Sequence, residues 1–357
     1  MNTIPGPAEF IDIGADVGGI REMLQRRRLL VLGGLALLLL AGFVTAMLLG
    51  DFPVTPEQIV TALFSPFTGV TQKGIDFIVL GVRLPRTLVA MLAGAAFGLS
   101  GALFQGVLRN PLASPDIIGI SMGASTTAVA AILILHWGGG WLSMAALVGG
   151  LATAALIYLI AWQHGVSPYR VVLVGIGVGA VATAIMSYLF TRARLVEVQQ
   201  AVTWLTGSLN GVQMKDAGLL AAEITALALL LWPLSRAASA LELGDDAARA
   251  LGNRVESSRF MLLGIGVALC ALATAVTGPI AFVSLMAGPI ARLLLGPSSG
   301  ALVPAALTGA LVTLGADIVA QHFLDGIQLP VGVVTGGVGA LFLIAMLIAA
   351  NKSGRTS

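Results

Sequence analysis

The chain has 357 residues, of which 57% are hydrophobic and only 10% are charged, and its mean hydropathy is +0.97. This small number of polar side chains cannot cover the surface of a soluble globule of this length, so the composition predicts an integral membrane protein. Because lipid offers the backbone no hydrogen-bond partners, we expect an all-α fold. The formal net charge is +2 and the sequence has no basic stripe, which excludes nucleic acid as a partner.

Residues 1–28 precede the first apolar run and carry several arginines. These cations lie too far from the start for a typical secretory signal, so we interpret the segment as a cytoplasmic N-terminal tail. About ten apolar runs follow, each close to the roughly 20 residues that cross a bilayer. They are 29–50, 84–108, 114–136, 141–163, 170–190, 213–234, 260–279, 281–297, 301–322 and 329–350.

Residues 29–350 are thus expected to form a single transmembrane domain, followed by a cytoplasmic C-terminal tail at 351–357. Ten spans with an internal N-terminus place most of the 19 lysines and arginines on the cytoplasmic side. The positive-inside rule therefore predicts that both termini are cytoplasmic.

Side chains that could bind a metal ion or a nucleotide are scattered. Cys270 is the single cysteine, and His136, His164 and His322 fall on different segments, so no metal site is predicted. Asp317 is the one acid placed well inside an apolar run, either as a functional group or in a structural pair. No G-x-x-x-x-G-K-[ST] loop occurs, so ATP would have to bind another subunit.

Four motifs in chain order carry a family resemblance. The block RLPRTLVAMLAGAAFGLSGALFQGVLRNPLASPDIIGISMGA resembles the signature of the FecCD permeases, the membrane subunits of ABC importers for ferric siderophores, haem and vitamin B12. The further matches are LELGDDAARALGNRVESSR at 241–259, GPIAFVSLMAGPIAR at 278–292 and QLPVGVVTGGVGA at 328–340. GIGVGA at 175–180 and TGSLNG at 206–211 are most similar to the second permease subunit of ferric-enterobactin importers.

The resemblance implies a BtuC-like type II ABC importer permease fold, with ten helices per subunit and an inverted repeat of helices two to five and seven to ten. It implies a non-enzymatic subunit in the bacterial inner membrane that moves ferric siderophore, or alternatively haem or cobalamin. Expected partners are a homologous permease chain, two copies of an ATPase that binds ATP and Mg, a periplasmic binding protein and membrane lipid.

Two other classes of protein stay open. An ion-driven secondary transporter should show a relay of ionisable residues within the membrane, and only Asp317 stands out. A membrane-embedded enzyme should show convergent catalytic groups, and none is visible in the sequence.

Arg83 and Arg86 lie three residues apart at the start of the second run, on one side of the helix and against its dipole. The resemblance implies that they dock the binding protein, and the alternative is interfacial anchoring by snorkelling. A third docking arginine of the family is replaced by Gln321, which predicts that docking on this subunit is weaker or differently shared.

The polar segment 236–259 matches the loop that couples to the ATPase, and a short surface helix is expected there; the alternative is a solvated loop. The implied coupling residues are Gly244, Asp245, Asp246, Ala247, Ala248, Arg249, Leu251 and Gly252. Near the eighth run, Pro289 and Leu293 replace a histidine and an arginine of the family. We expect this proline, which follows Gly288, to reshape the helix end. Because Gln321, Pro289 and Leu293 stand where the family has other residues, we expect a heterodimer in which the second chain supplies the missing groups.

Proline breaks follow the second run and precede the fifth. The resemblance implies an inner gate there, formed by Asn110, Leu112, Pro168 and Tyr169, and the alternative is simple inter-helix turns. The fifth run is expected to line the pathway with Gly175, Gly177 and Gly179, although glycines also permit plain helix packing.

Overall fold

The computed structural model describes residues 7–50, 52–69, 72–163, 168–296, 300–323 and 328–353. All regular secondary structure within these ranges is helical, which confirms the all-α membrane fold. Eight of the helices are long and apolar enough to cross a membrane, and α5 and α12 are shorter apolar helices. The helices that match the ten runs are α1 (Pro7–Leu48), α4 (Leu84–Leu108), α5 (Ile120–Leu133), α6 (Gly140–Ala161), α7 (Pro168–Arg192), α9 (Met214–Glu242), α11 (Val255–Thr277), α12 (Val283–Leu295), α13 (Leu302–His322) and α14 (Val331–Ser353).

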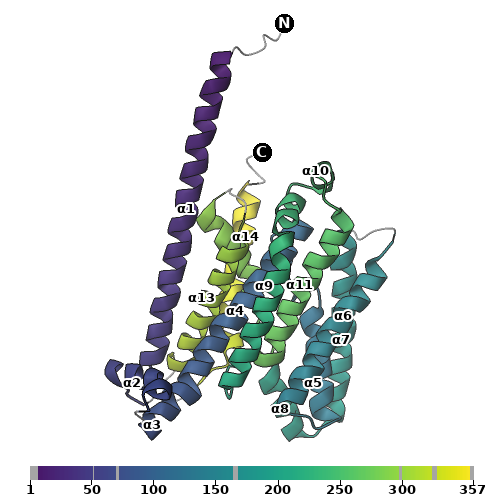
Figure 1. Ribbon diagram of the computed structural model, residues 1–357. Coiled ribbons are helices and arrows are strands. Elements are labelled where there is room, and N and C mark those ends of the chain that lie inside the picture. Colours follow the sequence, from purple (N-terminus) through teal and green to yellow (C-terminus); the bar gives the residue numbers. More distant parts are fainter. Residues whose placement is uncertain are drawn as a thin grey trace.

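Helix α1 includes most of the segment expected as an N-terminal tail, whose cytoplasmic position stays a prediction. It begins at Pro7, so residues 7–28 are helical and continuous with the first span. No proline occurs between residues 8 and 52, and residues 20–30, IREMLQRRRLL, are rich in strong helix formers. In Figure 1, α1 extends beyond the other helices. Residues 1–6 and 354–357 of the two expected tails lie outside the described residues.

Several helices outside the ten runs were not predicted. Residues 52–83 contain α2 (Pro56–Thr68), α3 (Lys73–Asp76) and the π-helix η1 (Phe77–Arg83), and α8 (Leu195–Leu205) follows α7. The start of α2 has a local signature, because Thr55 Oγ1 accepts a hydrogen bond from the Gln58 amide at 3.3 Å and the Thr55 amide donates to Gln58 Oε1 at 2.9 Å. This capping box was readable in the sequence as T-P-E-Q.

Helix α4 lies in the middle of the bundle and is buried along most of its length (Figure 1). It approaches α13 and α12 closely through small residues. A Cβ atom at Gly94 or Gly98 would meet the α13 backbone at Gly309 or Ala305, and one at Gly101 would meet the α12 backbone at Ser284. Such contacts bring helices together in lipid, where no hydrophobic force acts between them.

The two ends of the bundle carry different elements. The short helix α10 (Asp245–Ala250) lies at the same end as the start of α1 and the end of α14, and we call this the α10 end (Figure 1). Helices α2, α3 and α8 lie at the opposite end, the α8 end. Because α9 continues to Glu242 and α11 begins at Val255, only residues 243–254 connect them at the α10 end.

The packing of α4 generates a test with a matched control. We expect Gly101→Ala to lower the unfolding free energy by about 1–3 kcal/mol, because the added methyl group has no space beside Ser284. Gly264→Ala on α11 is the control, since a Cβ there meets nothing within 4 Å, and it should leave stability unchanged or raise it by up to about 1 kcal/mol. Thermal unfolding in detergent measures both, and equal shifts would contradict the packing argument.

Candidate functional site

Arg83 lies at the α8 end and ties the end of α1 to the start of α4. Its Nη1 donates to the Met47 carbonyl at 2.6 Å and its Nη2 donates to the Phe52 carbonyl at 2.6 Å. The last carbonyls of a helix lack partners within the helix, so the guanidinium group satisfies part of the C-terminus of α1. Arg83 is 8% exposed, so a partner protein could reach it only by displacing or sharing these contacts. Its predicted docking role stays a prediction.

Arg86 forms a bidentate ion pair with Asp317 across α4 and α13. Arg86 Nη2 lies 2.8 Å from Asp317 Oδ1, and Arg86 Nε donates to both carboxylate oxygens at 3.1 Å. Gln321 Nε2 donates to Asp317 Oδ2 at 2.8 Å, and Arg86 Nη1 donates to Asn210 Oδ1 at 2.6 Å. The Asp317 side chain is 2% exposed. The structure therefore places Asp317 in a pair and joins it to Arg86 and Gln321, which the sequence analysis had considered separately.

At the α10 end, Asp245 anchors α10 to the transmembrane helices. Its carboxylate accepts hydrogen bonds from Arg259 Nη2 at 2.8 and 2.9 Å and from Arg109 Nη2 at 3.2 Å. The Arg259 side chain, from the start of α11, is only 2% exposed. Burial would raise the pKa of the Asp245 carboxyl, but the hydrogen bonds and charges of Arg259, with the charges of Arg109 and Arg249, outweigh it and hold the pKa below its usual value of 3.8.

The other coupling residues divide into an inner and an outer side of α10. Ala248 is buried, whereas Asp246 and Arg249 are exposed and form an ion pair at 3.0 Å. Leu243 and Leu251, which flank the helix, are also exposed large apolar side chains. Gly252 follows with φ of +80°, a conformation that glycine adopts without strain. Together these residues form an exposed surface on a fixed short helix.

The expected gate residues lie at two turns. Helix α4 ends at Arg109 with φ of +51°, and the Leu112 amide donates to Asn110 Oδ1 at 2.9 Å. Pro168 begins α7, and Tyr169 is 74% exposed. Within the described part of the chain, no hydrogen bond or ion pair joins Asn110 or Leu112 to Tyr169. The gate stays a prediction.

The three expected pathway glycines do not share one face of α7. A Cβ at Gly175 would meet the backbone of Ile118, and Gly179 lies against Gly119, so both serve close packing against the segment before α5. Gly177 is exposed, and a Cβ there would meet nothing within 4 Å. Gly177 is thus the glycine of the three whose surroundings are open.

Asp116 was missed by the sequence analysis. It lies just before α5, and its carboxylate accepts hydrogen bonds from Ser121 Oγ at 2.6 Å and from Ser284 Oγ. These serines are the second residues of α5 and α12, so two helix N-termini meet at one carboxylate, where the helix dipole favours a negative charge. The signal was available as an acid directly before an apolar helix.

Pro289 does not reshape the end of α12 as expected. The helix continues through it to Leu295. Proline cannot donate to the Leu285 carbonyl four residues earlier, but Gln105 Nε2 of α4 donates to that carbonyl at 3.0 Å. A Cβ at Gly288 would collide with the Gln105 side chain, so Gly288 leaves the space that Gln105 occupies. Leu293, the other substituted position, is exposed.

No cluster of three or more His, Cys, Asp or Glu side chains suited to a metal ion occurs within the described ranges. Cys270 lies near Ser121, with 3.7 Å between the sulfur and the hydroxyl oxygen. His136 lies 3.7 Å from Glu197, and His164 lies outside the described residues.

The Arg86–Asp317 pair generates a stability test. Either Arg86→Gln or Asp317→Asn leaves a poorly paired polar group in the bundle, and we expect each to cost about 3 kcal/mol of unfolding free energy. The double variant should cost clearly less than the sum of the two. Thermal unfolding of the four proteins in detergent gives the coupling energy, with Lys215→Gln, an exposed cation on α9, as the control. Additive effects would show that the two groups do not interact.

Comparison with known proteins identifies relatives along almost the whole chain. The model of the FecCD transport family matches residues 38–349. The ferric enterobactin transport system permease protein FepG of Escherichia coli K12 is 39% identical over 328 residues, which cover 91% of this chain and 98% of FepG. The vitamin B12 import system permease protein BtuC of Escherichia coli O157:H7 is 33% identical over 336 residues, 92% of this chain and 98% of BtuC.

A solved structure supports the same assignment. A metal-chelate type ABC transporter in an inward-facing conformation superposes with a TM-score of 0.78 at 26% identity, covering 89% of this chain and 99% of that chain. The sequence and the fold thus agree along their length, and the chain belongs to the FecCD transport family.

Proposed function

We propose that this chain is the permease subunit of an ABC importer that carries ferric siderophore across the bacterial inner membrane. The observation that carries the proposal is α10, a short helix fixed by Asp245 whose outer side exposes Asp246 and Leu251. That arrangement suits a permanent partner on the cytoplasmic side. Similarity to FepG, named for ferric enterobactin, supports siderophore as the cargo.

ATP and Mg would bind to two copies of a separate ATPase that docks on α10, and this chain would bind no cofactor. The chain contains no phosphate-binding loop, which supports this division of labour. Both termini would then be cytoplasmic, because the start of α1 and the end of α14 lie at the α10 end.

A periplasmic binding protein would deliver the cargo at the α8 end. Arg83 and Arg86 donate hydrogen bonds to other residues of the chain. We therefore propose that they contribute positive charge and a fixed surface to the docking site of the binding protein. The inner gate would lie at Asn110, Leu112, Pro168 and Tyr169, with Gly177 on the pathway wall.

The partner permease would be a different, homologous chain. Gln321 stands where the resemblance implies a docking arginine, and in the structure Gln321 is used to hold Asp317. A homodimer would lack this arginine twice, whereas a heterodimer lets the second chain supply it to one lobe of the binding protein.

Cobalamin is the second candidate cargo, favoured by the 33% identity to BtuC. An ion-driven secondary transporter is less well supported, because Asp317 is held in an ion pair and Asp116 by two serine hydroxyls.

Reconstitution tests the function, the cargo and the dimer together. Liposomes would contain this chain, the ATPase and the binding protein, with or without a homologous permease chain. We expect ATP-dependent uptake of ferric enterobactin, well above that of haem or cobalamin, and only when the second permease is present. Uptake without the ATPase would contradict the proposal of an ABC importer. A preference for cobalamin would show that cobalamin, and not ferric siderophore, is the cargo. Full uptake without the second permease would overturn the proposed heterodimer.

Coupling through α10 has its own test. Gly252→Val should strain the backbone at φ of +80° and lower ATPase association, measured by co-purification and stimulated ATP hydrolysis, by roughly tenfold. Gly218→Val on α9 is the control, because a Cβ there meets nothing within 4 Å and φ is not positive. Both variants should keep the ten-helix fold, checked by thermal unfolding. Normal ATPase binding by Gly252→Val would remove this residue from the coupling surface.

A further inference from the structure

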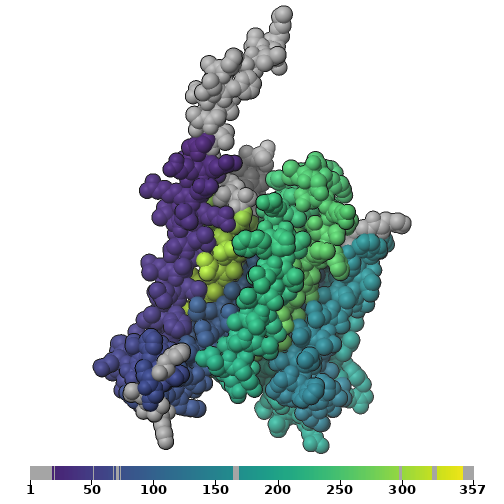
Figure 2. All heavy atoms as spheres, in the orientation of Figure 1, coloured from purple at the N-terminus to yellow at the C-terminus, as the bar shows by residue number. Residues whose placement is uncertain are grey.

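A small pocket opens at the α10 end between α1, α4, α9 and the start of α13. The space-filling view shows the surface hollowed between α1, in purple, and α9, in green, with yellow-green atoms of α13 behind (Figure 2). The cavity volume is about 150 Å³, below the roughly 300 Å³ at which pockets begin to hold a whole drug-sized ligand. It therefore suits one small polar group and not a chelated-iron cargo.

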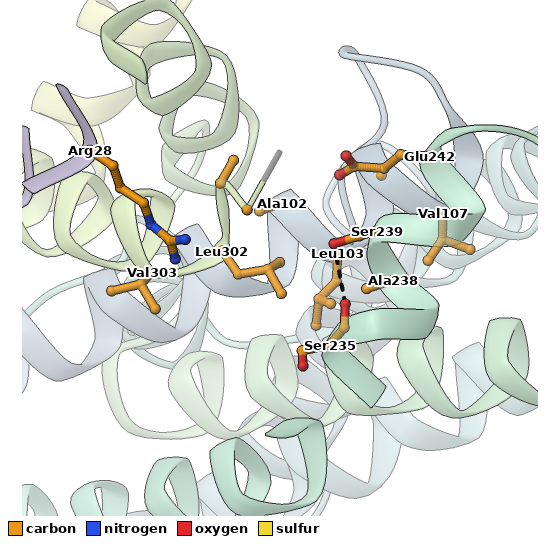
Figure 3. Close-up of a pocket in the computed structure, with 13 residues that line it drawn as sticks. Arg28, Ala102, Leu103, Val107, Ser235, Ala238, Ser239, Glu242, Leu302 and Val303 are labelled. Carbon is orange, nitrogen blue, oxygen red and sulfur yellow. Dashed lines mark hydrogen bonds between the residues drawn. The ribbon is translucent and has the colours of Figure 1, made fainter. Parts of the chain in front are cut away.

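One side of the pocket is cationic. Arg28 reaches into it from α1 (Figure 3). No hydrogen bond or ion pair joins Arg28 to another residue of the described ranges, so its five N–H donors are available. The apolar run of α1 begins at the next residue, Leu29. Arg28 thus lies where a charged segment meets an apolar one, and we expect lipid headgroups at such a boundary.

The opposite side is acidic and rich in hydrogen-bond acceptors. Glu242, at the end of α9, faces Arg28 across the pocket (Figure 3). Its carboxylate is only loosely paired, with 3.9 Å to Arg292 Nη2. The hydroxyl groups of Ser235 and Ser239 donate to the carbonyls of Trp232 and Ser235, which leaves their oxygen lone pairs to accept. This side is therefore suited to an ammonium group with several N–H donors.

The remaining walls are apolar and include Leu103, Val107, Leu302 and Val303. A ligand that matches the whole pocket needs a phosphate for Arg28, a primary ammonium for Glu242 and an apolar part.

We propose that the pocket binds the headgroup of phosphatidylethanolamine, with the acyl chains extending toward the membrane. The glycerol headgroup of phosphatidylglycerol would place no cation at Glu242, and a choline headgroup has no N–H to donate.

Native mass spectrometry of the purified full-length chain tests this selectivity. The protein would be mixed with phosphatidylethanolamine, phosphatidylglycerol or phosphatidylcholine of identical acyl chains, and the retained lipid counted. We expect phosphatidylethanolamine to be retained best, and Arg28→Gln and Glu242→Gln each to reduce its retention about fivefold. Arg21→Gln is the matched control, two turns earlier on the same face of α1, and should change nothing.

A charge reversal separates headgroup recognition from loss of folding. Glu242→Lys should move the preference from phosphatidylethanolamine to phosphatidylglycerol while the melting temperature stays near that of the unaltered chain. Soluble phosphoethanolamine, added as a competitor, should displace the lipid only weakly because it lacks the apolar part. Equal retention of the three lipids, no change of preference in Glu242→Lys, or full displacement by soluble phosphoethanolamine would each overturn the proposed lipid site.

Discussion

The close approach of α4 to α13 sets the geometry on which the rest of the bundle depends. Gly94 and Gly98 meet Gly309 and Ala305 at backbone distance. Since lipid provides no hydrophobic force between helices, this contact has to come from shape. The same contact fixes the register of the two helices. It thereby places Arg86, near the start of α4, opposite Asp317, near the end of α13. A side chain at the glycines would separate the helices and leave both charges without their partner.

Helix breaks within the membrane are the second constraint, because lipid cannot satisfy a freed backbone group. Side chains act at three such places. Gln105 donates to the carbonyl that Pro289 leaves without a partner, Arg83 donates to a carbonyl at the end of α1, and Asp116 accepts hydrogen bonds from serines in the first turns of α5 and α12. Helices α5 and α12 are each the second helix of one half of the inverted repeat that the resemblance implies, since α5 follows α4 and α12 follows α11.

The sequence allowed the positions of the ten apolar helices and the polar position of α10 to be predicted, because apolar runs of membrane length are a strong local signal, although α5 and α12 are shorter than a full span. Contacts across the chain could not be predicted. Arg86 and Asp317 are 231 residues apart, and nothing in either run shows that they meet. Gly175 and Gly177 looked alike in the sequence, and only the position of the 114–119 segment distinguishes the packed glycine from the open one. The helix at 7–28 was not predicted, because a charged segment before the first apolar run was interpreted as a tail.

The two ends of the bundle use charge differently, and this bears on how a partner could act on it. At the α8 end the guanidinium groups of Arg83 and Arg86 are bound within the chain. At the α10 end Asp246 and Leu251 are exposed, while Asp245 ties the same short helix to Arg259 of α11 and Arg109 at the end of α4. A partner that moves α10 therefore pulls on α4 and α11 together. These helices begin the two halves, so under the proposed function one contact surface would reach both.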